Sequence, residues 1–349
     1  MDVLNGRNDD GDMRGHLRRN AVKALALIAV LGVSLFGYYR HRETQLRLPP
    51  AHSVAGPVAV TQGPQSPASS KLVSSGTPSQ RGTHTQWSNK YFRTEDYFDF
   101  VSRAARAAYD GDGRAAHYVA DALTACILVS TMVRTNPDAE TEYRRQFVDL
   151  PNAPQWVRDV NLKKFSRCEH LGKGDPFQDL PPGKGDYQSP GYWREKALSD
   201  GDSLALVQRA ARELAQVADA TGNRRDIIEH AQADVATSMN SADPESMFSI
   251  GSLLGNGRYT RDITRGIAIA LAACDLGYDC SAANPENTFA GCKDSGACPA
   301  DADYAYFVEQ GMGEKAYAQA YAQAQEFKDA LLRRDQEEIR KFITIDGEF

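Results

Sequence analysis

Most of the chain beyond residue 90 has apolar residues at spacings of three and four, which is the pattern of an amphipathic helix. Helices are predicted over residues 100–108, 113–133, 192–199, 203–220, 225–239, 244–254, 263–276, 303–310 and 314–332. Near the C-terminus, Asp335 and Glu338 have the spacing of a capping box, which predicts one more helix start. The alternation that marks a strand forms no convincing series, so the predicted fold class is all-α.

A different pattern near the N-terminus predicts a membrane anchor. Residues 24–39 are sixteen positions without a charge, and residues 21–39 make nineteen when Lys23 extends its ammonium outward. A helix of that length nearly spans a hydrocarbon core about 30 Å thick. The segment 37–42 at its end is bulky and basic, whereas a signal-peptide cleavage site needs small residues. We therefore predict an uncleaved transmembrane helix over residues 21–39, behind a cytoplasmic tail of residues 1–20.

The next stretch, residues 40–89, is predicted to be a linker. From Leu48 to about Ser88 it is rich in Pro, Ser, Gly, Thr and Gln and has no apolar periodicity. Such a stretch cannot bury enough apolar surface to offset the entropy lost on ordering. It is expected to be disordered and to separate the anchor from a helical-repeat domain over residues 90–349.

Charge and cysteine distribution predict the orientation of the anchor. The positive-inside rule slightly favours a cytoplasmic N-terminus: Arg14, Arg18, Arg19 and Lys23 lie just before the apolar run, and Arg40, Arg42 and Arg47 lie just after it. All of the cysteines lie beyond the anchor, at Cys126, Cys168, Cys274, Cys280, Cys292 and Cys298. An even number of cysteines in an exported domain predicts disulfides. The expected location is the inner membrane of a Gram-negative bacterium, single-pass, with the C-terminal domain in the periplasm.

The spacing of the cysteines favours disulfides over a metal site. The last four form a C-x5-C-x11-C-x5-C array, whereas structural zinc sites usually use shorter spacings. Four cysteines allow three connectivities, and the sequence does not choose among them. Cys126 and Cys168 are expected to form a third bridge, with two buried free thiols as the alternative. We expect no metal and no cofactor.

A junction between helices recurs along the domain. Residues 107–112 and 196–202 both end in Gly-Asp, and residues 240–243 end in an aspartate 41 positions after Asp202. Glycine suits a left-handed helix C-cap, and aspartate suits an N-cap. This combination predicts tight helix hairpins.

Residues 243–279 hold Ile250 and Gly251 in a first predicted helix, followed by small or capping residues at Gly257, Asp262, Gly266, Ala272, Ala273 and Gly277. This set resembles a Sel1-like repeat, a relative of the tetratricopeptide repeat with a helix pair in each unit. Residues 192–202 resemble the end of another unit, and residues 100–116 a third. The chain departs from the family at Ser246, where alanine is usual, and in the interval from Gly111 to Gly201, which is too long for one unit. The resemblance implies irregular stacked hairpins for protein–protein contact and no catalytic residue.

One tetrapeptide matches a catalytic sequence motif. Residues 201–204, Gly-Asp-Ser-Leu, spell the nucleophile block of a known hydrolase family. That chemistry needs a serine on a turn after a buried strand, and a downstream Asp-x-x-His to supply the base. Here the block follows a charged helix, and no Asp-x-x-His follows it. It is therefore predicted to be a helix junction in which Asp202 is the N-cap, and we expect no catalytic residue.

The net charge of the domain argues against one class of partner. The formal net charge is −6, but residues 1–89 carry a net of +5, which leaves −11 on residues 90–349. An acidic domain argues against nucleic acid as a partner. Aromatic residues near the C-terminus form a candidate binding surface, with helix packing as the alternative: Tyr304, Tyr306, Tyr317 and Tyr321.

These patterns together predict a membrane-anchored, non-catalytic module that binds another envelope protein, whose identity the sequence does not give. One alternative is an envelope hydrolase or glycan-active enzyme. Another is an immunity or inhibitor protein that acts against a periplasmic toxin.

Overall fold

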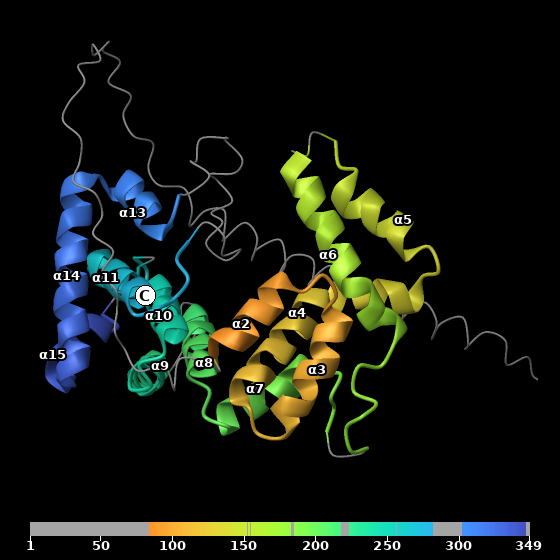
Figure 1. The fold of residues 1–349 in the computed structure, drawn as a ribbon, viewed down its shortest axis with the longest axis horizontal. Coiled ribbons are helices and arrows are strands. Elements are labelled where there is room, and N and C mark those ends of the chain that lie inside the picture. The colour runs from red at the N-terminus through yellow and green to blue at the C-terminus, as the bar shows by residue number, and fades with distance from the viewer. Residues whose placement is uncertain are drawn as a thin grey trace, which may run out of the picture. The chain divides into compact units, whose positions relative to one another are not determined.

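The computed structural model describes residues 84–151, 153, 155–182, 185–217, 223–255, 257–281 and 302–346. All regular structure within these ranges is helical, which confirms the all-α fold class (Figure 1). The predicted tail, the anchor at residues 21–39 and nearly all of the linker lie outside the described residues, as do Cys292 and Cys298.

The first group of helices is α2 (His84–Arg93), α3 (Tyr97–Tyr109), α4 (Gly113–Thr135), α5 (Ala139–Tyr143), the π-helix η1 (Arg144–Val148), α6 (Gln155–Lys173) and α7 (Pro190–Ser199). The second group is α8 (Ser203–Gln216), α9 (Arg224–Met239), α10 (Pro244–Leu254), α11 (Ile263–Asp275), α13 (Tyr304–Met312), α14 (Glu314–Arg333) and α15 (Gln336–Ile343). The predicted segment 244–254 coincides with α10. The start of α2 lies inside the segment that the sequence assigned to the linker.

The helices pack in successive pairs. α4 packs against α7, with α3 and α6 also against it, whereas α8 packs against α9 and α10 against α11. α8 also contacts both α4 and α10. One apolar core lies among α2 to α7 and the start of α8, and a second lies among α8 to α15. In Figure 1 these cores correspond to the orange-to-green and the green-to-blue helices.

Two of the predicted junctions have the same geometry. Gly111 and Gly201 adopt φ values of +107° and +76°, so both are in the left-handed region that favours glycine. After each glycine, the N–H of Asp112 or Asp202 donates to a carbonyl oxygen five residues earlier, at 3.0 and 2.9 Å. Each aspartate side chain then caps the next helix, α4 or α8.

The third junction differs at the glycine position and in the N–H of its aspartate, which donates to the Oγ of Ser241 at 3.3 Å. Ala242 occupies the position of the glycine and adopts a φ of +50°. The next residue, Asp243, caps α10 and accepts a hydrogen bond from the N–H of Ser246 at 3.0 Å. Because a Cβ crowds the backbone in the left-handed region, this junction is strained where the other two are not.

Glycine also permits the close crossing of α10 and α11. A Cβ on Gly266 would lie 2.2 Å from the backbone nitrogen of Gly255, and one on Gly251 would lie 2.6 Å from that of Ala270. Neither position accepts any larger residue without movement of the backbone. Ala273, farther along α11, is fully buried, with an exposed fraction of 0%.

Two disulfides are present in the described residues. Cys126–Cys168 joins α4 to α6, which confirms the predicted bridge, and Cys274–Cys280 closes the end of α11. The segment from α5 to α6 is an excursion between the paired helices α4 and α7, and the first disulfide ties it to α4. α6 was not predicted, because among its described side chains only Phe165, Cys168 and Leu171 are buried.

Within the described ranges, α4 is the helix that is long and apolar enough to cross a membrane. Half of its most apolar window is buried in the protein, and the helix packs against α3, α6 and α7. Its apolar character is accounted for by this central position in the first core.

Candidate functional site

The Gly-Asp-Ser-Leu block lies at the start of α8, and its serine hydroxyl is enclosed. Ser203 is 7% exposed. Its Oγ lies 2.8 Å from the Oγ of Ser246 and 3.3 Å from a guanidinium nitrogen of Arg114. A nucleophilic serine must reach a substrate carbonyl and hold a base within hydrogen-bonding distance. This hydroxyl instead contacts other buried side chains of the protein.

Those side chains surround Arg114, in the first turn of α4, which is 1% exposed. Its Nε donates to Asp202 at 2.6 Å and its Nη2 to Asp243 at 2.8 Å. Its Nη1 donates to Glu245. Since Asp202 and Asp243 are also the N-caps of α8 and α10, one guanidinium joins the first turns of three helices. We call these four charged residues the Arg114 cluster.

The Arg114 cluster holds three carboxylates around one guanidinium. Burial by itself lowers the pKa of Arg114, but Asp202, Glu245 and Asp243 together raise it above its ordinary value. Burial raises the pKa of Asp243, but Arg114 and the hydrogen bonds from Ser246 lower it by more, so the net shift is downward. The N-termini of α8 and α10 add positive partial charge beside the carboxylates. The cluster is therefore a buried network that fixes helix positions.

A second buried group lies beside the cluster on α4. The Nε2 of His117 lies 3.4 Å from the carboxylate of Asp121, and its Nδ1 lies 3.8 Å from that of Asp202. Burial by itself lowers the pKa of His117, but the carboxylate and hydrogen bond of Asp121 raise it overall. Burial by itself raises the pKa of Asp121, but the charge and hydrogen bond of His117, with smaller effects of Gln208 and Arg194, lower it overall. The pair ties successive turns of α4 through a protonation-dependent contact.

One group of described side chains has the composition of a metal site. Donor atoms of Glu213, His230 and Asp234 lie within 4.8 Å of one another. However, both carboxylate oxygens of Asp234 accept hydrogen bonds from Arg209, at 2.7 and 2.6 Å. The Nδ1 of His230 lies 2.8 Å from Glu213. A guanidinium bound to a ligand carboxylate opposes a divalent cation, so this geometry fits an ion-pair network between α8 and α9 better than a metal centre.

The four tyrosines of the candidate surface are not equivalent. Tyr304 is buried, and its ring packs edge-on against Phe248 at 5.0 Å, so it belongs to the second core. Tyr306 and Tyr317 are half-buried, and Tyr321 is 43% exposed. Tyr317 and Tyr321 lie one turn apart on α14, with ring centroids separated by 6.2 Å. The exposed part of the predicted surface is therefore centred on α14.

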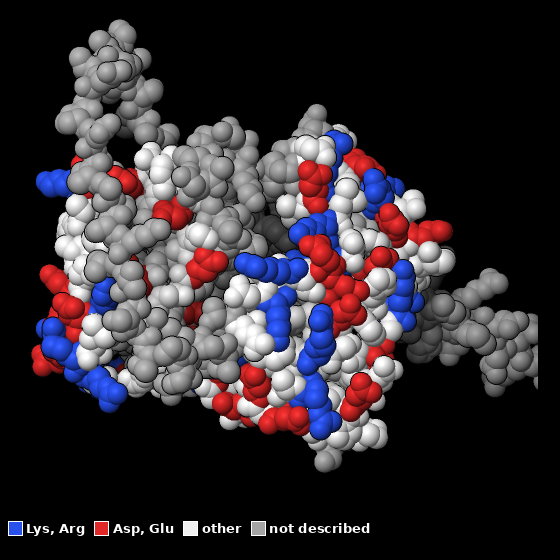
Figure 2. All heavy atoms as spheres, in the orientation of Figure 1, with Lys and Arg blue, Asp and Glu red and all other residues white. Residues whose placement is uncertain are grey.

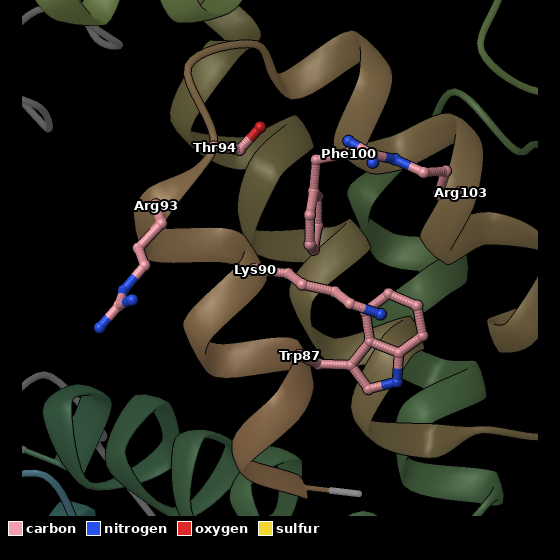
Figure 3. Close-up of a pocket in the computed structure, with 6 residues that line it drawn as sticks. All are labelled: Trp87, Lys90, Arg93, Thr94, Phe100 and Arg103. Atoms are coloured by element: carbon pink, nitrogen blue, oxygen red, sulfur yellow. The ribbon is translucent and has the colours of Figure 1, made fainter.

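A hollow with different chemistry lies between α2 and α3. It has a volume of about 230 Å³ and is lined by Trp87, Lys90, Arg93, Thr94, Phe100 and Arg103 (Figure 3). Phe100 and Trp87 are buried, with their ring centroids 6.3 Å apart. The Nζ of Lys90 lies over the Trp87 ring, 4.4 Å from its centroid. Figure 2 shows several Lys and Arg side chains on the face that α2 and α3 form, with Asp and Glu side chains beside them.

Sequence reasoning missed both the Arg114 cluster and the hollow. The sequence did contain a local indication of the hollow, because Trp87, Lys90 and Arg93 are spaced three residues apart and therefore lie near one another along α2. The Arg114 cluster had none, since its carboxylates lie between 88 and 131 residues from Arg114 along the chain.

The chain matches no protein-family model, no curated protein and no solved structure.

Proposed function

We propose that this chain is a membrane-anchored periplasmic module of helical repeats that binds another envelope protein and catalyses no reaction. The observation that carries the proposal is the enclosure of Ser203. This serine belongs to the one recognisable catalytic motif of the sequence. Its hydroxyl lies 2.8 Å from the Oγ of Ser246, and the nearby carboxylates of Asp202 and Asp243 are bound by Arg114.

The packing of the helices supports a repeat arrangement. α4, α8 and α10 each begin at an aspartate N-cap, and each packs against a second helix, α7, α9 or α11. We take each pair as one repeat unit, with the excursion from α5 to α6 inserted into the first. This insertion accounts for the interval between Gly111 and Gly201 that is too long for one Sel1-like unit. Stacked units of this kind present extended surfaces to protein partners.

The disulfides support the periplasmic location. Cys126–Cys168 and Cys274–Cys280 are formed, and disulfides persist in oxidising compartments. In intact cells, a thiol reagent that crosses membranes should label few cysteines unless a reductant is added first. Protease added to spheroplasts should remove the domain. Protection from protease, together with full labelling without reductant, would contradict the periplasmic location.

Photocrosslinking of the full chain in its own membrane tests partner binding. A benzophenone amino acid at Tyr321, the exposed tyrosine of α14, should give one discrete adduct of higher mass. The matched control is the same amino acid at Arg225, whose side chain is 89% exposed on α9. The control should give no such adduct. Equal patterns at the two positions would contradict a partner surface on α14.

The enzyme alternative is tested on the same protein. Purified full chain and its Ser203→Ala variant are each incubated with peptidoglycan sacculi, and soluble fragments are measured. We expect neither to release fragments. Release by the wild type that a folded Ser203→Ala variant loses would show that the chain is a hydrolase.

A further inference from the structure

The hollow between α2 and α3 has cations that the rest of the domain does not balance. None of Lys90, Arg93 and Arg103 forms an ion pair with any residue in the described part of the chain. Lys90 contacts the Trp87 ring, and the Nε of Arg103 donates to the backbone oxygen of Asp99 at 3.0 Å. Their charged ends remain available for an anion.

Several other exposed cations of the domain are paired with a carboxylate one helical turn away, as in the pairs Arg106–Asp110, Arg145–Glu142, Lys173–Glu169, Arg225–Glu229 and Lys341–Glu338. Residues 90–349 carry a net charge of −11, whereas the hollow is lined by three cations and by no carboxylate. Figure 3 shows Lys90 reaching across the hollow from α2 and Arg103 reaching toward Phe100 from α3.

The aromatic wall of the hollow is held in place. The Nε1 of Trp87 donates to the carboxylate of Asp112 at 2.8 Å, and the same aspartate caps α4 through its other oxygen. Phe100 is 2% exposed and packs edge-on against Trp87. With Trp87 9% exposed and Phe100 2% exposed, these rings fix the helices that carry the cations, and the ligand meets the cations themselves.

We infer that this hollow binds a short acidic peptide segment of the protein partner, whose carboxylates meet Lys90 and Arg103. The inference rests on the proposed function for the nature of the partner. Carboxylates match Lys90 and Arg103 in charge, and Arg can bind a carboxylate through two parallel hydrogen bonds.

Charge also favours a short segment over a broad anionic surface. A membrane of anionic lipids or a long polyanion would approach the whole acidic domain and be repelled by it. A short peptide that enters a hollow of about 230 Å³ contacts chiefly the local cations. Interactions between more distant charges are screened over about 8 Å at physiological salt.

Fluorescence anisotropy with the full chain in detergent micelles tests the inference. The probe is a fluorescein-labelled peptide of sequence Asp-Glu-Leu-Asp-Glu-Leu, and the matched probe has Asn and Gln in place of its acids. The acidic probe should bind, and more weakly as salt rises, whereas the amide probe should not. Lys90→Gln/Arg103→Gln should weaken binding about tenfold or more. Lys315→Gln, which removes an exposed charge from α14, should leave binding unchanged.

Several outcomes would overturn the inference. These are equal binding of the two probes, an undiminished affinity in Lys90→Gln/Arg103→Gln, or tighter binding of phosphatidylglycerol vesicles or tetragalacturonate than of the acidic peptide. The proposed function is tested separately by the crosslink at Tyr321. If that adduct forms and the acidic peptide does not bind, the hollow is wrongly assigned and the partner proposal stands. If the peptide binds through Lys90 and Arg103 and no adduct forms, the partner surface on α14 fails and the hollow stands.

Discussion

Replacement of Arg114 by methionine should be among the most destabilising single substitutions in the domain. The guanidinium is 1% exposed and donates to Asp202, Asp243 and Glu245, whose side chains are at most 10% exposed. Methionine fills much of the same volume but leaves three carboxylates without a counter-charge. Removing one partner of a buried ion pair typically costs about 3–5 kcal/mol, because the remaining charge is buried and unpaired. A single domain has only about 5–15 kcal/mol of total stability.

The assay is urea unfolding of the compact unit Ser70–Phe349, followed by circular dichroism with the disulfides intact. The midpoint should fall while the slope stays close to that of the wild type, since the area exposed on unfolding is similar. The control is Arg225→Met, which removes an arginine whose side chain is 89% exposed and paired with Glu229. It should change the free energy of unfolding by no more than about 0.5 kcal/mol.

A rescue variant shows whether charge is the cause. Asp202→Asn, Asp243→Asn and Glu245→Gln added to Arg114→Met make the cluster neutral, and asparagine caps a helix about as well as aspartate. This variant should recover most of the lost stability, because neutral side chains cost much less to bury than unpaired charges. The reasoning would be refuted if Arg114→Met cost less than about 1 kcal/mol, or if the neutral variant were no more stable than Arg114→Met alone.

Three further predictions concern the backbone and pH. Ala242→Gly should raise the urea midpoint, with a gain of about 1 kcal/mol from relief of the left-handed strain at φ +50°, and a lower midpoint would contradict it. Gly266→Ala should cost about 1–3 kcal/mol or more, because its Cβ would lie 2.2 Å from a backbone nitrogen, whereas Gly191→Ala, with its nearest atom at 3.3 Å, should be nearly neutral in the same assay. His117 has a raised pKa, so its stabilising contact with Asp121 is fully present below the unfolded value of about 6.5 and is lost as pH rises through the folded value. Wild-type stability should therefore fall as pH rises from about 6.5, and His117→Gln should remove that dependence; an identical pH profile in the two proteins would contradict it.

Local features of the sequence determined the type and bounds of many helices. The Gly-Asp junctions at Asp112 and Asp202 and the predicted bounds of α10 agree with the structure, because caps and helical periodicity depend on residues within a turn or two. The bridge between Cys126 and Cys168 was also predictable, since the other four cysteines form a separate cluster.

Only the tertiary structure decided which helices pair and which charges meet. α4 pairs with α7 although α5, η1 and α6 lie between them in the sequence. α6 was not predicted, because its few buried residues gave too weak a periodicity. The same packing encloses Ser203 with Arg114, although 89 residues separate them, and so removes the one catalytic motif from reach of a substrate. Pairing over such distances depends on the summed burial of whole helix faces and on charges placed by the fold, and neither is set by neighbours along the chain.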